Sequence, residues 1–317
     1  MHLNNKLVLL PGDASFRKFY RKKNSIIVFC EKEKKNNLLI YDAINKVLIK
    51  NKIKAPKLIS ENYKKNFIEI EDLGKTSFYI KLKKRKNSKI NYYKKIILLL
   101  SKLQTIKTKK IKTFTNSNYI IPKYSKNKLF NESNLFLEWY VSKIIKGRNQ
   151  RKIKNKLKII IKKLIDKIMD NNNIFVHRDF HISNLMEYKK RIALIDSQDA
   201  VYGNRAYDLA SLIDDVRFKT TIHEKKKIFN AYIKLNKGID IIKFMNDFEI
   251  LSVLRNLKII GIFTRLSIRD KKHTYLKLIP YAWSLIEFRI NNNMKFLELK
   301  EVLDKYFSKK IRKKKWK

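Results

Sequence analysis

The sequence predicts an α+β fold, in which a small antiparallel sheet lobe at the N-terminus precedes a larger, mainly helical lobe. Three observations support this class. Strand-like apolar runs occupy the first 70 residues or so, apolar residues recur with a helical period through most of the rest, and a hairpin at 176–199 interrupts the helices. We place the boundary after Leu73, so that 1–73 forms the first lobe and 74–317 the second.

Short apolar runs define the predicted sheet. They flank a polar turn at 11–15 and end at polar residues, which is typical of strands. An apolar helical period over 37–50, with Pro56 soon after it, predicts one helix that crosses the sheet. The predicted strand segments are 7–10, the residues around Phe19, 25–30 and 67–70.

Helices dominate after a connector at 71–74. Apolar residues there recur with a period close to 3.6, and we find no internal repeat. Two polar, basic stretches, 81–89 and 107–128, are predicted to be long loops. The predicted helices are 90–103, 135–145, 157–169, 207–216, 225–235, 241–266 and 275–290.

The charge of the chain does not by itself indicate a nucleic-acid partner. Lys and Arg number 75 against 28 Asp and Glu, a net charge of +47, which would attract any polyanion. Lysine nevertheless recurs through nearly every segment beside Asn and Ile, as codon bias in an AT-rich genome would produce. We therefore expect no specific nucleic-acid partner, and we expect the dense basic block at 308–317 to be a solvated end.

The composition also indicates the cellular compartment in which the protein is expected. A single cysteine, Cys30, allows no intrachain disulfide and suits a reducing environment. No apolar run reaches the ~18 residues of a membrane span, and the first residues lack a signal-peptide pattern. We expect a cytoplasmic protein without a membrane partner, and the sequence leaves its oligomeric state open.

The hairpin carries three side chains at informative spacing. Asp179 precedes Asn184 by five residues, and Asn184 precedes Asp196 by twelve. This is the spacing of a kinase catalytic loop, in which the first residue accepts the acceptor hydroxyl's proton and the other two hold Mg²⁺ on the phosphates of ATP. We therefore predict Asp179 as the catalytic base and Asn184 and Asp196 as magnesium ligands.

Other residues of this region are predicted to shape the loop. His177 and Arg178 are expected to form structural hydrogen bonds rather than to transfer protons. Asp208 is expected to anchor the loop backbone or to pair with Arg178, because a buried carboxylate needs such partners. Asp199 either lies behind the metal or is a turn residue, and the sequence favours neither.

Four blocks of sequence resemble one enzyme family. Together they are similar to the aminoglycoside phosphotransferase and choline kinase superfamily, and more closely to the bacterial kinases that phosphorylate the anomeric hydroxyl of N-acetylmuramate and N-acetylglucosamine in cell-wall recycling. The resemblance implies a bilobal, protein-kinase-like fold. The blocks are GDASFRKFYR at 12–21, IEDLG at 70–74, the stretch 177–215 and LRNLKIIGIFTRLSIRDKKHTYLKLIP at 254–280.

The resemblance also implies a nucleotide site. Ser15 and Phe16 belong to the turn that would cover the phosphates, although that turn contains one glycine only. Ile70 and Asp72 lie in the segment that would meet adenine through backbone groups, and Arg17 faces either the phosphates or solvent. One element is missing, because the third strand at 26–30 lacks the lysine that usually contacts the α and β phosphates.

The sequence offers several candidates to replace the missing lysine and to bind the acceptor, and it does not choose among them. Lys32 and Lys34 follow the third strand, and Asp42 is the only acid on the crossing helix. For the acceptor, Arg255, Lys258 and Arg265 fall near one helix face, where they either hold a lactyl carboxylate or form a solvated surface. Glu138 could bind sugar hydroxyls, and its neighbour Trp139 either stacks on the sugar or packs in the core.

The sequence thus predicts a magnesium- and ATP-dependent sugar kinase. The alternatives are a kinase for an aminoglycoside, choline or another alcohol, which would place acidic residues near Asp179, and a decayed, basic nucleic-acid-binding protein. The latter would require broken catalytic positions, and these are intact. A protein kinase is disfavoured because no APE-like segment follows Asp196.

Overall fold

The computed structural model describes residues 7–10, 17–84, 89–314 and 316. The chain forms two compact units. The first contains Met1–Pro122 and Ile174–Tyr202, and the second contains Lys123–Asn173 and Gly203–Lys317. The hairpin therefore belongs to the same unit as the N-terminal sheet, although about fifty residues of the second unit precede it in the chain. The lobe boundary expected after Leu73 stays a prediction.

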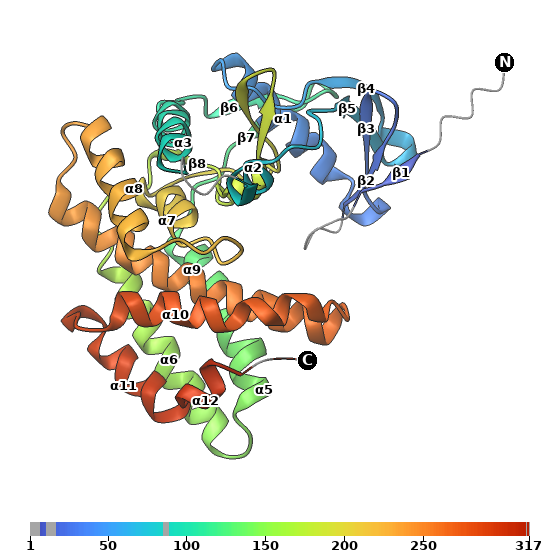
Figure 1. The fold of residues 1–317 in the computed structure, drawn as a ribbon. Helices are drawn as coiled ribbons and strands as arrows, with labels where there is room; N and C mark the ends of the chain where they lie inside the picture. Colours follow the sequence, from blue (N-terminus) through green and yellow to red (C-terminus); the bar gives the residue numbers. More distant parts are fainter. Residues whose placement is uncertain (1–6, 11–16, 85–88, 315, 317) are drawn as a thin grey trace. The chain divides into compact units, whose positions relative to one another are not determined.

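The first unit contains a five-stranded antiparallel sheet, drawn in blue in Figure 1. Its order is β1-β2-β3-β5-β4, and each predicted strand segment is present. The strand that sequence patterning missed is β4, whose LISEN sequence lacks apolar alternation and whose pairing with β5 shifts register between Leu58 and Ser60. The strands are Val8–Leu9 (β1), Lys18–Arg21 (β2), Ser25–Phe29 (β3), Leu58–Asn62 (β4) and Phe67–Glu71 (β5).

Helix α1, Asn36–Lys50, confirms the predicted crossing helix. Because side chains alternate along a strand, Ile26 and Val28 of β3 lie on the same face as Ile68 and Ile70 of β5. These residues form one buried cluster with Leu38 and Tyr41 of α1. The apolar face of the sheet is therefore covered by α1.

Both stretches predicted as loops contain regular secondary structure, so this prediction was wrong in part. Residues 81–84 continue α2, and 107–128 contains a small hairpin whose polar sequence gave no strand signal. Residues 85–88 lie outside the described residues, and residue 89 begins α3. The further elements of this unit are α2 (Phe78–Lys84), α3 (Lys89–Gln104), β6 (Lys110–Lys112), β7 (Asn118–Ile120), β8 (Ile174–Val176), β9 (Leu185–Tyr188), β10 (Arg191–Leu194) and β11 (Val201–Gly203).

The second unit is helical. Several predicted boundaries differ from the structure, and two differ most. The helix expected at 135–145 begins earlier and contains a π-helical segment, and the one expected at 157–169 begins at Asn149, where the lysine-rich sequence hid the apolar period. Its elements are α4 (Lys126–Leu135), η3 (Phe136–Val141), α5 (Ser142–Ile144), α6 (Asn149–Asp166), α7 (Ala206–Ile213), α8 (Ile222–Leu235), α9 (Ile241–Arg269), η5 (His273–Leu278), α10 (Ile279–Ile290), η6 (Met294–Phe296), α11 (Leu297–Tyr306) and α12 (Lys309–Arg312).

Helix α9 packs closely against the junction of α4 and η3. A Cβ atom added to Gly261 would lie 2.3 Å from the carbonyl carbon of Leu135. Only a residue without a side chain lets two backbones approach this closely. Gly261 therefore sets the distance between α9 and the π-helical segment.

Part of the basic C-terminal block is anchored, contrary to the expected solvated end. Arg312 is buried, and its guanidinium donates to Glu287 at 2.8 Å and to Asp304 at 2.7 Å. The Arg312 side chain also stacks over the Trp283 ring. Within the described part of the chain, no helix is both long and apolar enough to span a bilayer.

Candidate active site

Backbone hydrogen bonds fasten the hairpin to the segments on either side of β4 and β5. The Leu194 N–H donates to the Lys54 carbonyl at 2.8 Å, and the Glu187 N–H donates to the Thr76 carbonyl at 2.9 Å. Because these bonds join backbone groups, they do not depend on side-chain identity. They place Asp179, Asn184 and Asp196 at a fixed position relative to the sheet of the same unit.

Four residues of the hairpin have left-handed backbone angles; Lys189 and Lys190 form the turn between β9 and β10, and the other two flank the predicted site. Arg178 has φ 74° and Asp196 has φ 63°. This conformation costs a non-glycine residue of order 1 kcal/mol and persists only where surrounding contacts enforce it. Such strain is frequent at functional sites, and here it occurs at one predicted metal ligand and beside the predicted base.

The amide of Asn184 is oriented by the loop backbone. Its Nδ2 donates to the Asp179 carbonyl at 3.0 Å, while the backbone carbonyl of Asn184 accepts from the Ile195 N–H at 3.1 Å. With Nδ2 directed to Asp179, Oδ1 is the amide atom that suits a cation. The three predicted residues therefore come together in one small region.

The carboxylate of Asp196 has a charged environment. Burial raises its pKa, Arg17 lowers it, and the carboxylates of Asp179 and Asp199 raise it again. The side chain keeps 37% of its surface exposed. The carboxylates of Asp179 and Asp199 thus disfavour the charged form of Asp196, and a further cation beside Arg17 would relieve that repulsion.

The residues expected to shape the loop have structural partners. His177 is fully buried, its Nε2 lies 3.1 Å from the Ile195 carbonyl, and burial lowers its pKa to about 4. It is therefore neutral at physiological pH. Arg178 contacts Asp199 through the Asp199 carbonyl at 3.2 Å and Oδ1 at 3.4 Å. Asp208 is buried in α7 of the second unit, and its role stays a prediction.

A cavity of about 580 Å³ lies within the first unit. Asn184 and Asp196 contribute to its lining, as do Ile70 and Asp72 of the predicted adenine segment. Ser15 and Phe16 lie outside the described residues. The apolar part of the lining can accept a flat base, while the polar part contains Asn184 and Asp196 of the predicted catalytic loop. Its apolar side chains are Leu10, Phe19, Ile26, Ile70, Leu73, Met186 and Ile195.

A bidentate ion pair supports the Asp72 segment. Arg21 donates through Nε to Asp72 Oδ2 at 2.6 Å and through Nη2 to Oδ1 at 3.0 Å, and it also donates to the Gly74 carbonyl at 2.9 Å. The Asp72 side chain therefore holds the segment, which leaves the backbone as the part available to a base. Sequence reasoning missed Arg21, although Arg17, Phe19 and Arg21 alternate as residues of one strand face would.

The donor set is consistent with magnesium. Asn184 and Asp196 supply two oxygen-bearing side chains, and magnesium is bound by one or two carboxylates or amides, several waters and substrate phosphates. Among the described residues, no three or more His, Cys, Asp or Glu side chains gather as a dedicated metal site. The sparse set therefore fits a metal that arrives with a nucleotide.

Comparison with known families decides the class of the protein. Residues 6–242 match the model of the phosphotransferase enzyme family, whose members include the aminoglycoside phosphotransferases. The chain belongs to this family. It is therefore an enzyme that phosphorylates a hydroxyl-bearing acceptor, and the family implies use of ATP.

Relatives of this phosphotransferase share a name. It is 27% identical to an N-acetylmuramate/N-acetylglucosamine kinase of Neisseria meningitidis, over 86% of this chain and 82% of that protein. It is 24% identical to the kinase of the same name from Pseudomonas aeruginosa, over 94% and 88%. The match to Pseudomonas putida is 26% identical, over 94% and 87%.

Solved structures confirm the expected bilobal, kinase-like fold class. An ADP-bound aminoglycoside phosphotransferase matches with a TM-score of 0.61 at 13% identity, covering 89% of this chain and 92% of that one. A choline/ethanolamine kinase family protein from Mesorhizobium loti matches with a TM-score of 0.62 at 12% identity, covering 94% and 92%. At these identities the similarity concerns the fold alone.

The phosphotransferase's predicted acceptor residues all lie in the second unit, and they do not form a solvated face. Arg255 is buried, and its Nη1 has no hydrogen-bond partner among the described residues. Lys258 pairs with Glu132 at 2.7 Å. Arg265 is half-buried, burial lowers its pKa, and the charge of exposed Glu138 raises it. Trp139 is neither fully buried nor fully exposed.

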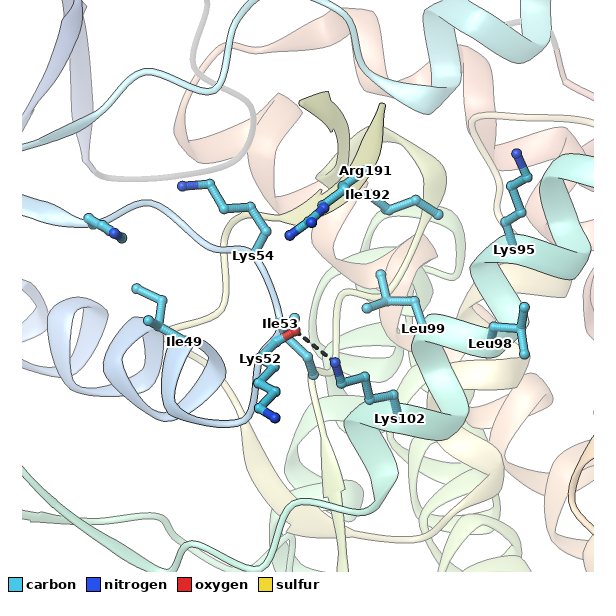
Figure 2. Close-up of a pocket in the computed structure, with 11 residues that line it drawn as sticks. Ile49, Lys52, Ile53, Lys54, Lys95, Leu98, Leu99, Lys102, Arg191 and Ile192 are labelled. Carbon is cyan, nitrogen blue, oxygen red and sulfur yellow. Dashed lines mark hydrogen bonds between the residues drawn. The ribbon is translucent and has the colours of Figure 1, made fainter. Parts of the chain in front are cut away.

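A second hollow of about 470 Å³ in the first unit is basic (Figure 2). Its cations do not converge. Figure 2 shows Lys54 and Lys95 ending in different directions, and Lys102 donates to the Lys52 carbonyl at 2.8 Å. Lys54 also pairs with Glu71, which lines the 580 Å³ cavity described above. We assign no ligand to this hollow.

Proposed function

We propose that this phosphotransferase transfers the γ-phosphoryl group of ATP to the anomeric hydroxyl of an N-acetylated amino sugar, N-acetylmuramate or N-acetylglucosamine. The product is a sugar 1-phosphate, which a route that recycles cell-wall amino sugars in the cytoplasm would activate further. The observation that carries the acceptor class is the name shared by relatives that align along most of the chain.

Asp179 accepts the proton of the attacking hydroxyl in this proposal. Its backbone is held by the Asn184 amide and by the His181 N–H, which donates to the Asp179 carbonyl at 3.0 Å. A carboxylate positioned at the hydroxyl contributes a factor of about 10²–10⁴ in rate. His177 is an unsuitable base here, because it is buried and bonded to the loop backbone.

Asn184 and Asp196 would hold magnesium, which when bound offsets negative charge on the phosphates. The apolar cavity side chains would hold the base, and the backbone of 70–73 would read its polar edge. The protein's contribution is therefore to position the phosphates, exclude water and place a proton acceptor.

We further propose that Arg255, Lys258, Arg265 and Glu138 serve the acceptor. Arg265 is the first to test, because it keeps exposed surface, whereas Arg255 is buried and Lys258 is paired with Glu132. A guanidinium suits the lactyl carboxylate of N-acetylmuramate, which N-acetylglucosamine lacks. Arg265→Gln should therefore raise KM for N-acetylmuramate more than for N-acetylglucosamine.

A phosphate-transfer screen tests the function. The protein is incubated with ATP and magnesium over amino sugars, aminoglycosides, choline and simple hexoses, and NMR locates the new phosphate. We expect turnover with N-acetylated amino sugars and phosphate at position 1, lost in Asp179→Asn. Preferred turnover of choline or an aminoglycoside would contradict the assignment of a sugar as the acceptor. Undiminished turnover in Asp179→Asn would contradict the role of Asp179 as the catalytic base.

A further inference from the structure

The third strand of the sheet lacks the lysine that usually serves the nucleotide phosphates in kinases. Strand β3, Ser25–Phe29, contains no lysine, and Cys30 follows it. The two lysines next in sequence do not fill the gap, because Lys32 and Lys34 belong to a short helical turn and are exposed. A kinase must nevertheless balance the charge of the polyphosphate.

Arg17 is a buried cation behind the cavity wall, in contact with three lining residues, Phe19, Tyr41 and Asp196. It directly precedes β2, only 5% of its surface is exposed, and its Nη2 donates to Asp196 Oδ1 at 2.7 Å. Its Nη1 donates to Asn37 Oδ1, in the first turn of α1, at 3.2 Å. The guanidinium therefore joins the crossing helix to the predicted metal ligand.

Aromatic side chains fix the position of this guanidinium. It lies 5.7 Å from the ring centroid of Phe19 and 5.5 Å from that of Tyr41, and both rings line the cavity. Arg17 also lies near the end of β3. Burial raises the pKa of the Cys30 thiol to about 11, and the charge of Arg17 opposes that rise. Arg17 thus reaches, from the β2 side, the region that a β3 lysine would occupy.

A lysine at the end of β3 usually joins the α and β phosphates to a residue on the crossing helix. Arg17 makes the corresponding connection to α1, and it contacts Asp196 at the polar end of the cavity. A guanidinium stays charged at any physiological pH and presents several donors in one plane, so it can serve two oxygen partners together.

We propose that Arg17 supplies the positive charge for the nucleotide phosphates that a third-strand lysine supplies in other kinases. In this role it also orients Asp196. The proposal rests on the use of ATP proposed above but not on the identity of the acceptor.

Calorimetric binding of ATP, ADP and adenosine, each with and without magnesium, tests this role. Arg17→Gln should weaken ATP and ADP binding by about 10- to 100-fold and change adenosine binding less than about twofold, because adenosine carries no phosphate. Arg17→Lys, which keeps the charge, should recover part of the affinity. Lys18→Gln is the matched control, since Lys18 is the neighbouring cation and is exposed; it should bind as the unaltered protein does.

The possible outcomes distinguish a failure of the role proposed for Arg17 from a failure of the proposed use of ATP. An equal loss of ATP and adenosine affinity in Arg17→Gln would show a structural role only, and unchanged ATP affinity would exclude any phosphate role. If Arg17→Gln does not fold, Arg17→Met keeps the side chain packed against Phe19 and Tyr41 and gives the same comparison. A lack of ATP binding by the unaltered protein would instead refute the use of ATP.

Discussion

Asp214 is predicted to make the free energy of unfolding of the second unit fall at acidic pH. This fully buried carboxylate at the end of α7 accepts from Lys225 Nζ at 2.9 Å, from Arg289 Nη2 at 2.8 Å and from Ser252 Oγ at 2.6 Å. It therefore joins α7 to α8, α9 and α10. Burial alone would raise its pKa, but the charges of Arg289 and Lys225 outweigh burial and lower it from 3.8 to about 2.

The sign and size of this pH dependence follow from the coupling between protonation of Asp214 and folding. The folded state binds the proton less tightly than the unfolded state, so the carboxylate stabilises the fold above pH ~4 and loses this effect as the pH falls towards 2. Lowering the pKa from 3.8 to about 2 corresponds to about 2 kcal/mol of stability in total, of which about 1 kcal/mol is lost by pH 3. Asp214→Asn also leaves two buried cations without their counter-charge, which costs about 3–5 kcal/mol at neutral pH.

Urea unfolding of the unaltered protein and Asp214→Asn at pH 6 and pH 3 measures both effects. The difference in free energy of unfolding between the two proteins should shrink by about 1 kcal/mol at pH 3, because the unaltered protein then loses part of the stabilisation from the Asp214 charge. The other carboxylates titrate in both proteins, so their effects cancel in this difference. Asp166→Asn is the control, since its ion pair with Lys126 is exposed. If Asp214→Asn does not fold, Ser252→Ala should give a smaller change of the same sign. A difference that stays constant between pH 6 and pH 3 would refute the role assigned to Asp214.

Three further predictions concern the site and the fold. Asp179→Asn should lower kcat by about 10²–10⁴-fold with ATP affinity largely kept, as steady-state kinetics and calorimetry together would show. Asp196→Ala should weaken ATP binding in the presence of magnesium, and equal affinity with and without the metal in the unaltered protein would remove the metal role. Gly261→Ala should destabilise the fold by about 1–3 kcal/mol despite alanine's helix propensity, because the new Cβ would lie 2.3 Å from the Leu135 backbone; an unchanged or raised melting temperature would contradict the close approach.

Local sequence signals are enough to bring the three candidate residues of the hairpin together. Asp179, Asn184 and Asp196 lie within eighteen positions of one another, so their spacing and the turn between two short strands suffice to bring them together. The long amphipathic helices were predicted for the same reason, because apolar periodicity is a local property.

Contacts across long stretches of chain were not predictable. Arg17 and Asp196 are 179 residues apart, and no local pattern distinguishes this arginine from the basic residues around it. The edge strand β4 was missed because its stability comes from pairing with β5 rather than from apolar alternation. The hairpin of β6 and β7 was missed because polar, lysine-rich residues hide a strand pattern.

The buried cations give an independent reason to regard Arg17 as selected for its chemistry. Lysine greatly outnumbers arginine in this chain, as codon bias would produce, and it dominates the surface. Among the described residues, however, the buried cations are four arginines and one lysine: Arg17, Arg178, Arg255, Arg312 and Lys225. A guanidinium is more weakly hydrated than an ammonium and can engage several oxygens in one plane, so its burial costs less when partners surround it. Codon bias alone would favour lysine at these positions too. The preference for arginine therefore reflects a physical requirement, and at position 17 that requirement lies beside the carboxylate expected to hold the metal.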